Sequence, residues 1–202
     1  MSLTKAQRIV LSYPPIKQRL ERSESDQQKI LKNLDEIKST FSKRSIGAVL
    51  SFLKIALNKI YENIHLELPD GVDFKELIKN NSVVLVPNHQ SHADYIALNY
   101  ALYSRFNTPI YIAGGINLNV FPIGKVFRES GCFFIRRSFS NDILYKLALE
   151  GYLFYLLSEG KPIEFFFEGG RSRSGKLLPP RYGLFQMLSV AHEHIPKEKK
   201  KK

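Results

Sequence analysis

The chain has 202 residues, 44% of them hydrophobic, and a formal net charge of +11 at pH 7. This length and composition predict one globular domain with a core of its own and room for a small appendage. The single cysteine, Cys132, excludes an internal disulfide, and the positive charge suits nucleic acid, anionic lipid, phosphorylated substrates or simply a solvated surface.

No targeting or membrane-spanning segment is predicted. The first fifteen residues lack the apolar stretch of a signal peptide. A spanning helix needs about 18 uncharged apolar residues in a row, and the sequence contains no such run. The most apolar candidate, Ile46–Leu57, is too short and is interrupted by Lys54.

Residues 1–68 predict a helical region that precedes the main domain. Residues 1–15 predict an irregular leader, which ends in two consecutive prolines. Two segments with helical spacing of their apolar residues follow, Ser23–Phe41 and Ser45–Leu66. Together they predict an N-terminal helical hairpin.

A turn signal at Pro69–Gly71 separates this region from an α/β domain predicted over residues 69–194, after which residues 195–202 form a basic tail. Apolar, partly β-branched segments predict four buried strands: Ser82–Pro87, Pro109–Gly115, Gly131–Arg137 and Lys161–Glu168. Helical segments alternate with them at Asp94–Tyr103 and Asn141–Ser158. This alternation predicts an α/β fold with a largely parallel, buried sheet flanked by helices and preceded by the helical hairpin.

Residues able to bind or react gather directly after three of the predicted strands. His89 follows the first, Arg136 and Arg137 close the third, and EGGRSRSGK (Glu168–Lys176) follows the fourth. In open α/β sheets, ligands bind outside the carboxyl ends of the strands. These segments are therefore expected to converge on one site.

The loop after the first strand, PNHQSHADY, leaves three interpretations open. His89 and Asp94 form a base and its orienting carboxylate if His89 lies in the loop and Asp94 in the first helical turn, since five residues on an ideal helix are about 140° apart. Alternatively, His89, His92 and Asp94 bind a metal ion, although their spacing departs from the H-x-H-x-D-H pattern of metallohydrolases. As a third possibility, both histidines only cap the helix.

The segment EGGRSRSGK has the frame of a phosphate-binding P-loop but lacks its chemistry. Leu177 stands where Ser or Thr would bind magnesium. Pro179-Pro180 forbids the helix whose N-terminus would face the phosphate. An anion-binding loop built on Arg171, Arg173 and Lys176 remains.

Arg136 and Arg137 stand directly beyond a buried strand, where arginine offers planar, bidentate recognition of phosphate. At least one of the two is expected to serve instead as a salt-bridge partner. Arg136 and Arg137 thus extend the anion-binding set, the interpretations of His89 stay open, and no convincing nucleophile is recognisable.

Three motif blocks resemble, in order and spacing, those of the glycerol-3-phosphate acyltransferases of bacterial type. The blocks are NHQSHADY (Asn88–Tyr95), GCFFIRR (Gly131–Arg137) and FFFEGGRSRSGKLLPP (Phe165–Pro180). The wider glycerolipid acyltransferase superfamily is marked by the H-x4-D pair. The resemblance extends over roughly Tyr13 to Ala191.

The resemblance implies transfer of an acyl group from acyl-CoA or acyl-carrier protein to the sn-1 hydroxyl of glycerol 3-phosphate, the first step of phospholipid synthesis. His89 is then the general base and Asp94 its orienter. The resemblance assigns phosphate binding to Arg136, Arg137, Arg171, Arg173 and Lys176. It assigns the shaping of the third block to Glu168, Gly169, Gly170 and Ser172. No metal and no cofactor other than the acyl-thioester co-substrate is implied.

Two departures from the family are visible. Gln90 stands where arginine is usual, and the fourth motif block is not found, so the C-terminal part of the acyltransferase domain is expected to be missing. Peripheral contact with an anionic membrane on the cytoplasmic face is expected, through Ile46–Leu57 or the basic surface. Dihydroxyacetone-phosphate acylation and an inactive lipid-phosphate binder stay open as alternatives, with a metallohydrolase more remote. Nucleic acid is not expected as a partner, since no nucleic-acid-binding module is recognisable.

Overall fold

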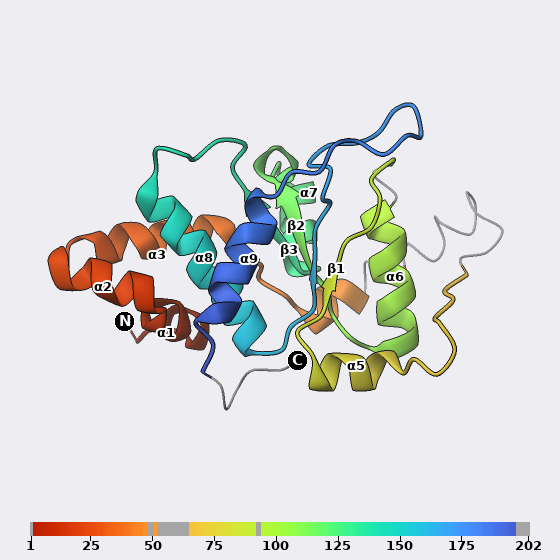
Figure 1. The fold of residues 1–202 in the computed structure, drawn as a ribbon, viewed down its shortest axis with the longest axis horizontal. Helices are drawn as coiled ribbons and strands as arrows, with labels where there is room; N and C mark the ends of the chain where they lie inside the picture. Colours follow the sequence, from red (N-terminus) through yellow and green to blue (C-terminus); the bar gives the residue numbers. More distant parts are fainter. Residues whose placement is uncertain (1, 48–50, 52–64, 92–93, 197–202) are drawn as a thin grey trace.

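Three short helices open the chain in the computed structural model, which describes residues 2–47, 51, 65–91 and 94–196 (Figure 1). They are α1 (Lys5–Ser12), α2 (Pro14–Arg22) and α3 (Asp26–Ile37). The prediction of an irregular leader over residues 1–15 is therefore wrong. A capping box starts α1, because Gln7 N donates to Thr4 Oγ1 while the Gln7 side chain accepts from Thr4 N. The two prolines occupy the first turn of α2, where their missing N–H groups cost nothing.

The second helix of the expected hairpin falls mostly outside the described residues. Its described beginning is helical from Lys43 to Gly47. Most of the candidate membrane segment Ile46–Leu57 also lies outside the described residues, as do residues 197–202 of the basic tail. Within the part of the chain that is described, no helix combines the length and apolar character needed to cross a bilayer.

The centre of the molecule is a four-stranded sheet in which every pairing is parallel. Its strands are β1 (Val84–Leu85), β2 (Tyr111–Gly115), β3 (Cys132–Ile135) and β4 (Ile163–Glu164), in the order β1-β4-β2-β3. All four lie inside the predicted strand segments, and the predicted parallel sheet is confirmed. Because β1 and β4 are neighbours, the loops that follow them emerge side by side.

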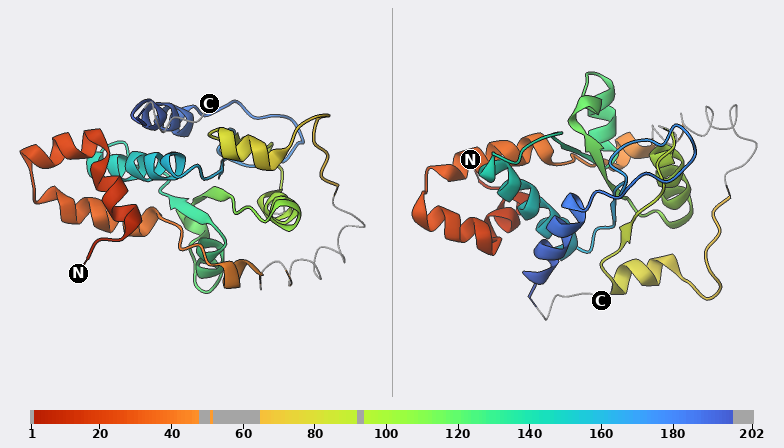
Figure 2. Two further views of the ribbon diagram at one scale, coloured as in Figure 1. Left: turned by 90° about the horizontal axis from the view of Figure 1, so that it is seen from below. Right: turned by 45° about the horizontal axis from the view of Figure 1, so that its top comes forward.

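Helices cover both faces of this sheet (Figures 1 and 2). Successive residues at the start of β2 point to opposite faces, as strand geometry requires. Tyr111 joins a large core with the N-terminal helices, α8 (Ile143–Ser158) and α9 (Gly183–Glu193). Ile110 and Ile112 join a smaller core with α5 (Phe74–Asn80) and α6 (Asp94–Phe106). The site is thus supported by two separate apolar layers.

Helix α8 anchors the larger core because it is apolar around most of its circumference. Ten of its residues are buried, and Asp142 caps its start by accepting from Tyr145 N at 3.0 Å. Gly151 lets the N-terminal helices approach closely, since a Cβ there would come within 2.8 Å of Ile16 Cδ1 and 2.9 Å of Val10 Cγ1. Each large apolar side chain buried in this way stabilises the fold by about 1.5–3 kcal/mol.

The connection from β2 to β3 contains a short 3-10 helix, η1 (Ile116–Leu118), and the helix α7 (Ile123–Glu129). In Figure 2, α7 stands out from the body of the molecule. The carboxyl ends of the strands meet at the upper edge of the sheet in Figure 1, where the loop after β4 and the start of α6 also lie. This edge is where the sequence places the candidate functional residues.

Candidate active site at the carboxyl ends of the strands

His89 and Asp94 contact each other directly. His89 lies in the loop after β1, and Asp94 is the first residue of α6. The distance from His89 Nδ1 to Asp94 Oδ2 is 3.2 Å. This is the loop-and-first-turn arrangement that the five-residue spacing demands. Because a carboxylate only accepts hydrogen bonds, it favours a proton on Nδ1 and leaves the lone pair of Nε2 to act as a base.

Asp94 is held as an anion by the backbone of its own loop. Its Oδ2 atom accepts hydrogen bonds from Gln90 N at 2.7 Å and Ser91 N at 2.8 Å. Burial alone would raise the pKa of Asp94, but these backbone bonds and the contact with His89 outweigh it, and the pKa lies below its ordinary value. A firmly ionised Asp94 can stabilise the imidazolium that forms when His89 takes up a proton.

The loop after β4 fixes His89 from the other side. Glu168 accepts from His89 N through Oε1 at 3.0 Å, and Ser172 N donates to the His89 carbonyl at 2.8 Å. The His89 ring stacks on Phe166, with 3.9 Å between ring centroids and 24° between planes. Hydrogen bonds and a ring stack therefore join the first and third motif blocks around the imidazole.

Glu168 is a structural link and is not turned toward a ligand. Its second oxygen, Oε2, accepts from Leu178 N at 2.9 Å, so both oxygens are used by backbone N–H groups. These bonds, from His89 first and then Leu178, lower the pKa of Glu168. Glu168 thereby joins its own loop to the loop after β1 at His89, and joins the start of its own loop to Leu178, ten residues further on.

The loop after β4 presents its cationic side chains to solvent. Arg171, Arg173 and Lys176 are exposed, and none of them forms a salt bridge within the described part of the chain. No helix begins until Gly183, as expected from Pro179-Pro180. The P-loop interpretation is therefore excluded by the fold as well as by Leu177.

Arg171 lies within electrostatic range of the first turn of α6. Burial, followed by the neighbouring Cys132, raises the pKa of Tyr95, and the positive charge of Arg171 opposes this shift. Tyr95 directly follows Asp94. The loop that carries Arg171 also reaches His89 through its backbone, since Ser172 N donates to the His89 carbonyl.

Arg136 and Arg137 have different surroundings. Arg136 donates to both carboxylate oxygens of Glu36 at 2.7 Å and to Asp142 at 2.9 Å, and it lies over the ring of Tyr145. The hydrogen bonds with Glu36 are the main reason that its pKa is raised. This geometry favours the salt-bridge alternative for Arg136, whereas Arg137 is exposed.

The metal interpretation receives no support from the described residues. His92, its second histidine, lies outside them. Among the residues that are described, no three His, Cys, Asp or Glu side chains come together in a group able to hold a metal ion. The His89–Asp94 contact, in contrast, already has the geometry of a base and its orienter.

A family model described as Acyltransferase matches residues 71–196 of the chain. The chain belongs to the acyltransferase family. The matched range contains the whole sheet, both loops around His89 and helices α5 to α9.

Curated relatives that match the chain are named glycerol-3-phosphate acyltransferase. The protein of Haemophilus influenzae (strain PittEE) is 43% identical over 171 residues, which are 85% of this chain and 21% of the relative. Those of Pseudoalteromonas translucida (strain TAC 125) and Aeromonas hydrophila subsp. hydrophila are 42% and 43% identical, over 81% and 78% of this chain and 20% of each relative. The chain thus spans about a fifth of the length of the curated relatives it matches.

Three residues near the candidate site are given no role by the sequence analysis. Phe166 stacks on His89, and the side chain of Arg181 crosses the backbone at Gly169, where a Cβ would lie 2.7 Å from Arg181 Cδ. Glu164 is fully buried in β4. Strand alternation could have indicated that Phe166 and Glu164 share a face of the sheet, but no sequence signal brings Arg181 back across the loop.

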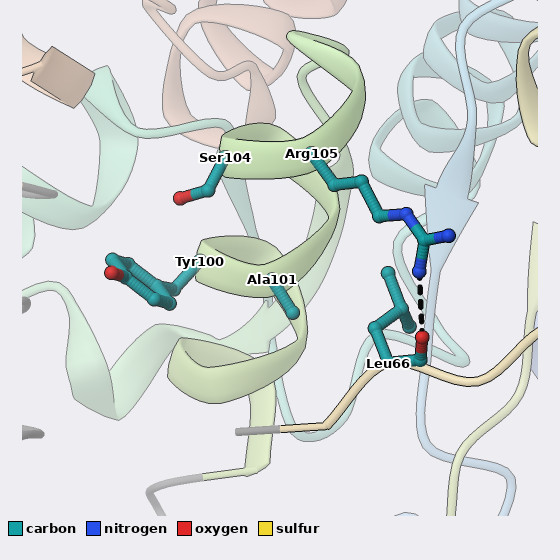
Figure 3. Close-up of a pocket in the computed structure, with 5 residues that line it drawn as sticks. All are labelled: Leu66, Tyr100, Ala101, Ser104 and Arg105. Carbon is teal, nitrogen blue, oxygen red and sulfur yellow. Dashed lines mark hydrogen bonds between the residues drawn. The ribbon is translucent and has the colours of Figure 1, made fainter. Parts of the chain in front are cut away.

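The hollow shown in Figure 3 lies on α6 and is separate from these residues. It is lined by Leu66, Tyr100, Ala101, Ser104 and Arg105, and Arg105 Nη1 donates to the Leu66 carbonyl at 2.7 Å. None of its lining residues belongs to a motif block. The candidate active site is therefore located by its chemistry rather than by this hollow.

Proposed function

We propose that this chain carries the catalytic core of a glycerol-3-phosphate acyltransferase. The single observation that carries the proposal is the 3.2 Å contact between His89 Nδ1 and Asp94 Oδ2. The backbone of His89 is hydrogen-bonded to the loop that bears Arg171 and Arg173. The names of the relatives that match over most of this chain support the choice of substrate.

In the proposed reaction, Nε2 of His89 accepts the proton of the sn-1 hydroxyl while the hydroxyl oxygen attacks the carbonyl carbon of an acyl thioester. A C–O bond forms and the C–S bond breaks. The leaving thiolate takes the proton from the imidazolium, which Asp94 has stabilised meanwhile. The products are 1-acylglycerol 3-phosphate and a free thiol, either CoA or acyl-carrier protein. The protein forms no covalent intermediate in this scheme.

The phosphate of the acceptor is assigned to exposed cations around the site. Arg171, Arg173 and Lys176 on the loop after β4, and Arg137 after β3, offer charge-assisted hydrogen bonds to phosphate oxygens. The charge of Arg171 near Tyr95 supports its inclusion. Arg136 contributes indirectly in this scheme, by holding the loop after β3 through Glu36 and Asp142.

The test is thiol release from a long-chain acyl-CoA, measured with and without glycerol 3-phosphate, for this chain and for a version extended to the length of its relatives. Release that depends on glycerol 3-phosphate and yields 1-acylglycerol 3-phosphate is expected. Faster release with dihydroxyacetone phosphate would assign that acceptor instead. An absence of acceptor-dependent release from both versions, with either CoA or carrier protein as donor, would leave a lipid-phosphate binder.

The proposal extends to peripheral contact with an anionic membrane on the cytoplasmic side. The formal net charge of +11 supports attraction to anionic lipid, and the lipid product must reach a bilayer. Co-sedimentation with phosphatidylglycerol-containing vesicles, weakened by added salt, is the expected result. Equal sedimentation with neutral vesicles at all salt concentrations would contradict electrostatic attachment.

A further inference from the structure

Glu164 is a buried acid in β4, two residues before Phe166, on which the His89 ring stacks. The residue is 0% exposed, and both of its carboxylate oxygens are without a hydrogen-bond partner among the described residues. An unpaired ionised carboxylate in such a place is strongly unfavourable. Its presence in β4, an internal strand of the sheet, therefore needs an explanation.

The register of the sheet shows which way Glu164 points. Glu164 pairs with Leu85 of β1 on one side and with Ile112 of β2 on the other, and Ile112 pairs in turn with Cys132 of β3. Side chains in one such row of a parallel sheet share a face. Leu85 and Ile112 belong to the core beneath α6, so the Glu164 carboxyl group points to that side.

Asp94, the partner of His89, begins the helix that covers this face. Burial, and then the negative charge of Asp94, raise the pKa of Glu164 to about 8. The pKa of Asp94 is lowered by its backbone hydrogen bonds, although burial opposes this. Two neighbouring carboxyl groups with pKa values driven apart are typical of sites in which one is ionised and the other neutral at pH 7.

The other titratable groups around Glu164 do not supply a compensating charge. Cys132 in the same row has its pKa raised to about 12 by burial, and Tyr95 on α6 also has a raised pKa because of burial. Arg128 of α7 acts on the Cys132 thiol, but its charge is not among the causes that shift the pKa of Glu164. Leu85 and Ile112 bring no charge, and among the described residues the charge that shifts the pKa of Glu164 is that of Asp94.

We propose that Glu164 is a positioning residue of the site: its neutral carboxyl group keeps the layer beneath His89 and Asp94 free of a second negative charge. This inference rests on the proposed acyltransferase function. Ionising Glu164 would place a carboxylate against Asp94 in a low-dielectric layer and repel a phosphate-bearing acceptor. Turnover with glycerol 3-phosphate should therefore fall when Glu164 loses its proton.

The first test needs no activity. Because the folded-state pKa of Glu164 lies above its ordinary value of 4.5, Glu164 costs the fold increasing stability as the pH rises from 4.5 to about 8. Glu164→Gln, an uncharged isostere, removes this cost. The midpoint of thermal unfolding of the variant should rise relative to the parent between pH 5 and pH 8. A constant difference over this range would overturn the inference.

The second test compares kcat/KM for glycerol 3-phosphate at pH 7 and pH 9. If Glu164 loses its proton with a pKa of about 8, kcat/KM of the parent chain should fall about tenfold between pH 7 and pH 9. Glu164→Gln should abolish this fall, and Glu164→Met serves as a second uncharged variant if the first folds poorly. Glu150→Gln is the matched control, because Glu150 is also a buried glutamate with a burial-raised pKa but lies on α8.

The outcomes separate the two proposals. If thiol release never depends on glycerol 3-phosphate, the proposed function fails and the positioning role falls with it, whatever the unfolding curves show. If release depends on glycerol 3-phosphate but kcat/KM falls equally from pH 7 to pH 9 in the parent and in Glu164→Gln, only the inference about Glu164 is overturned. Loss of the fall in Glu164→Gln, with the fall kept in Glu150→Gln, supports the positioning role.

Discussion

The loops after β1 and β4 and the loop after β3 all carry polar motif residues at the carboxyl edge of the sheet, but they use them in opposite ways. Around His89, the hydrogen bonds of Glu168 and Ser172 fix the backbone and use neither nitrogen of the imidazole ring. After β3, the guanidinium of Arg136 is itself bound by Glu36 and Asp142. A polar residue at the right edge of the sheet is functional only if its partners leave its reactive atoms free.

The largest effect is expected from removing the base. His89→Ala deletes the proposed proton acceptor, together with its contact with Asp94 and its stack on Phe166. General-base catalysis contributes about 10²–10⁴-fold, so kcat/KM for acyl transfer should fall by roughly 10³-fold. The measurement is thiol release with glycerol 3-phosphate, and circular dichroism checks the fold.

His192→Ala is the matched control, since His192 is in the last turn of α9 and outside the motif blocks. It should leave the rate unchanged. Equal losses in the two variants would mean that the His89–Asp94 contact has only a structural role.

Glu168→Gln should have the next largest effect, because an amide replaces one of two oxygens that accept backbone N–H groups. Wherever the amide nitrogen lies, a donor faces a donor, and the loop that holds His89 loosens. We expect kcat/KM to fall by about 10²-fold, since misplacement by about 1 Å is enough for such a loss. Glu21→Gln, an exposed glutamate at the end of α2, should leave it unchanged.

The same variant makes a prediction about pH. The folded-state pKa of Glu168 is below its ordinary value of 4.5, so its stabilising contribution is present above pH 4.5 and is lost as the pH falls through the folded-state pKa. The thermal midpoint of the parent should therefore drop more steeply below pH 4.5 than that of Glu168→Gln. If the thermal midpoints of the two proteins fell equally steeply below pH 4.5, the Glu168 carboxylate would not be held by His89 N and Leu178 N.

Arg136→Ala and Arg173→Ala compare a guanidinium that is bound in salt bridges with one that is exposed to solvent. Hydrogen bonds to charged groups contribute about 1.5–3 kcal/mol each, and the Arg136 pairs are only partly shielded from solvent. Arg136→Ala should thus lower the free energy of unfolding by about 2 kcal/mol in urea denaturation. Arg173→Ala, at an exposed position, should change it by less than about 0.5 kcal/mol and should mainly raise the KM for glycerol 3-phosphate.

The reverse pattern would refute the assignment. If Arg136→Ala raised the KM at unchanged stability, Arg136 would be the phosphate ligand. Glu36→Gln should reproduce part of the stability loss of Arg136→Ala, because it removes the charge of the partner while keeping its shape.

The parts of this site that the sequence predicts are those set by local rules. The spacing of His89 and Asp94 requires a loop followed by a first helical turn, and two prolines forbid a helix after Lys176. Continuous apolar strands predict the parallel sheet. Each of these depends on a few consecutive residues, so no knowledge of the rest of the fold is needed.

The parts that it does not predict depend on distant partners. Arg136 and Glu36 are 100 residues apart, and nothing near Arg136 indicates which carboxylate binds it. The adjacency of β1 and β4 is likewise a property of the sheet order, and it decides that Glu168 reaches the backbone of His89. The missed helix α1 is different, since the Thr4 and Gln7 capping box was visible in the sequence.

The smallest effects on stability are expected from alanine substitutions at two neighbouring glycines in the loop after β4, which should differ from each other. Gly169 has φ +61° and lies under Arg181, whereas a Cβ at Gly170 meets nothing within 4 Å, and the φ of Gly170 is not positive. The left-handed conformation costs an alanine roughly 1–2 kcal/mol, so Gly169→Ala should lower the free energy of unfolding by about that amount. Gly170→Ala should be neutral or stabilising by up to about 1 kcal/mol, because it restricts the unfolded chain without strain. Urea denaturation of both variants measures the difference, and equal values would mean that the loop does not hold the backbone geometry on which the Glu168 link to His89 depends.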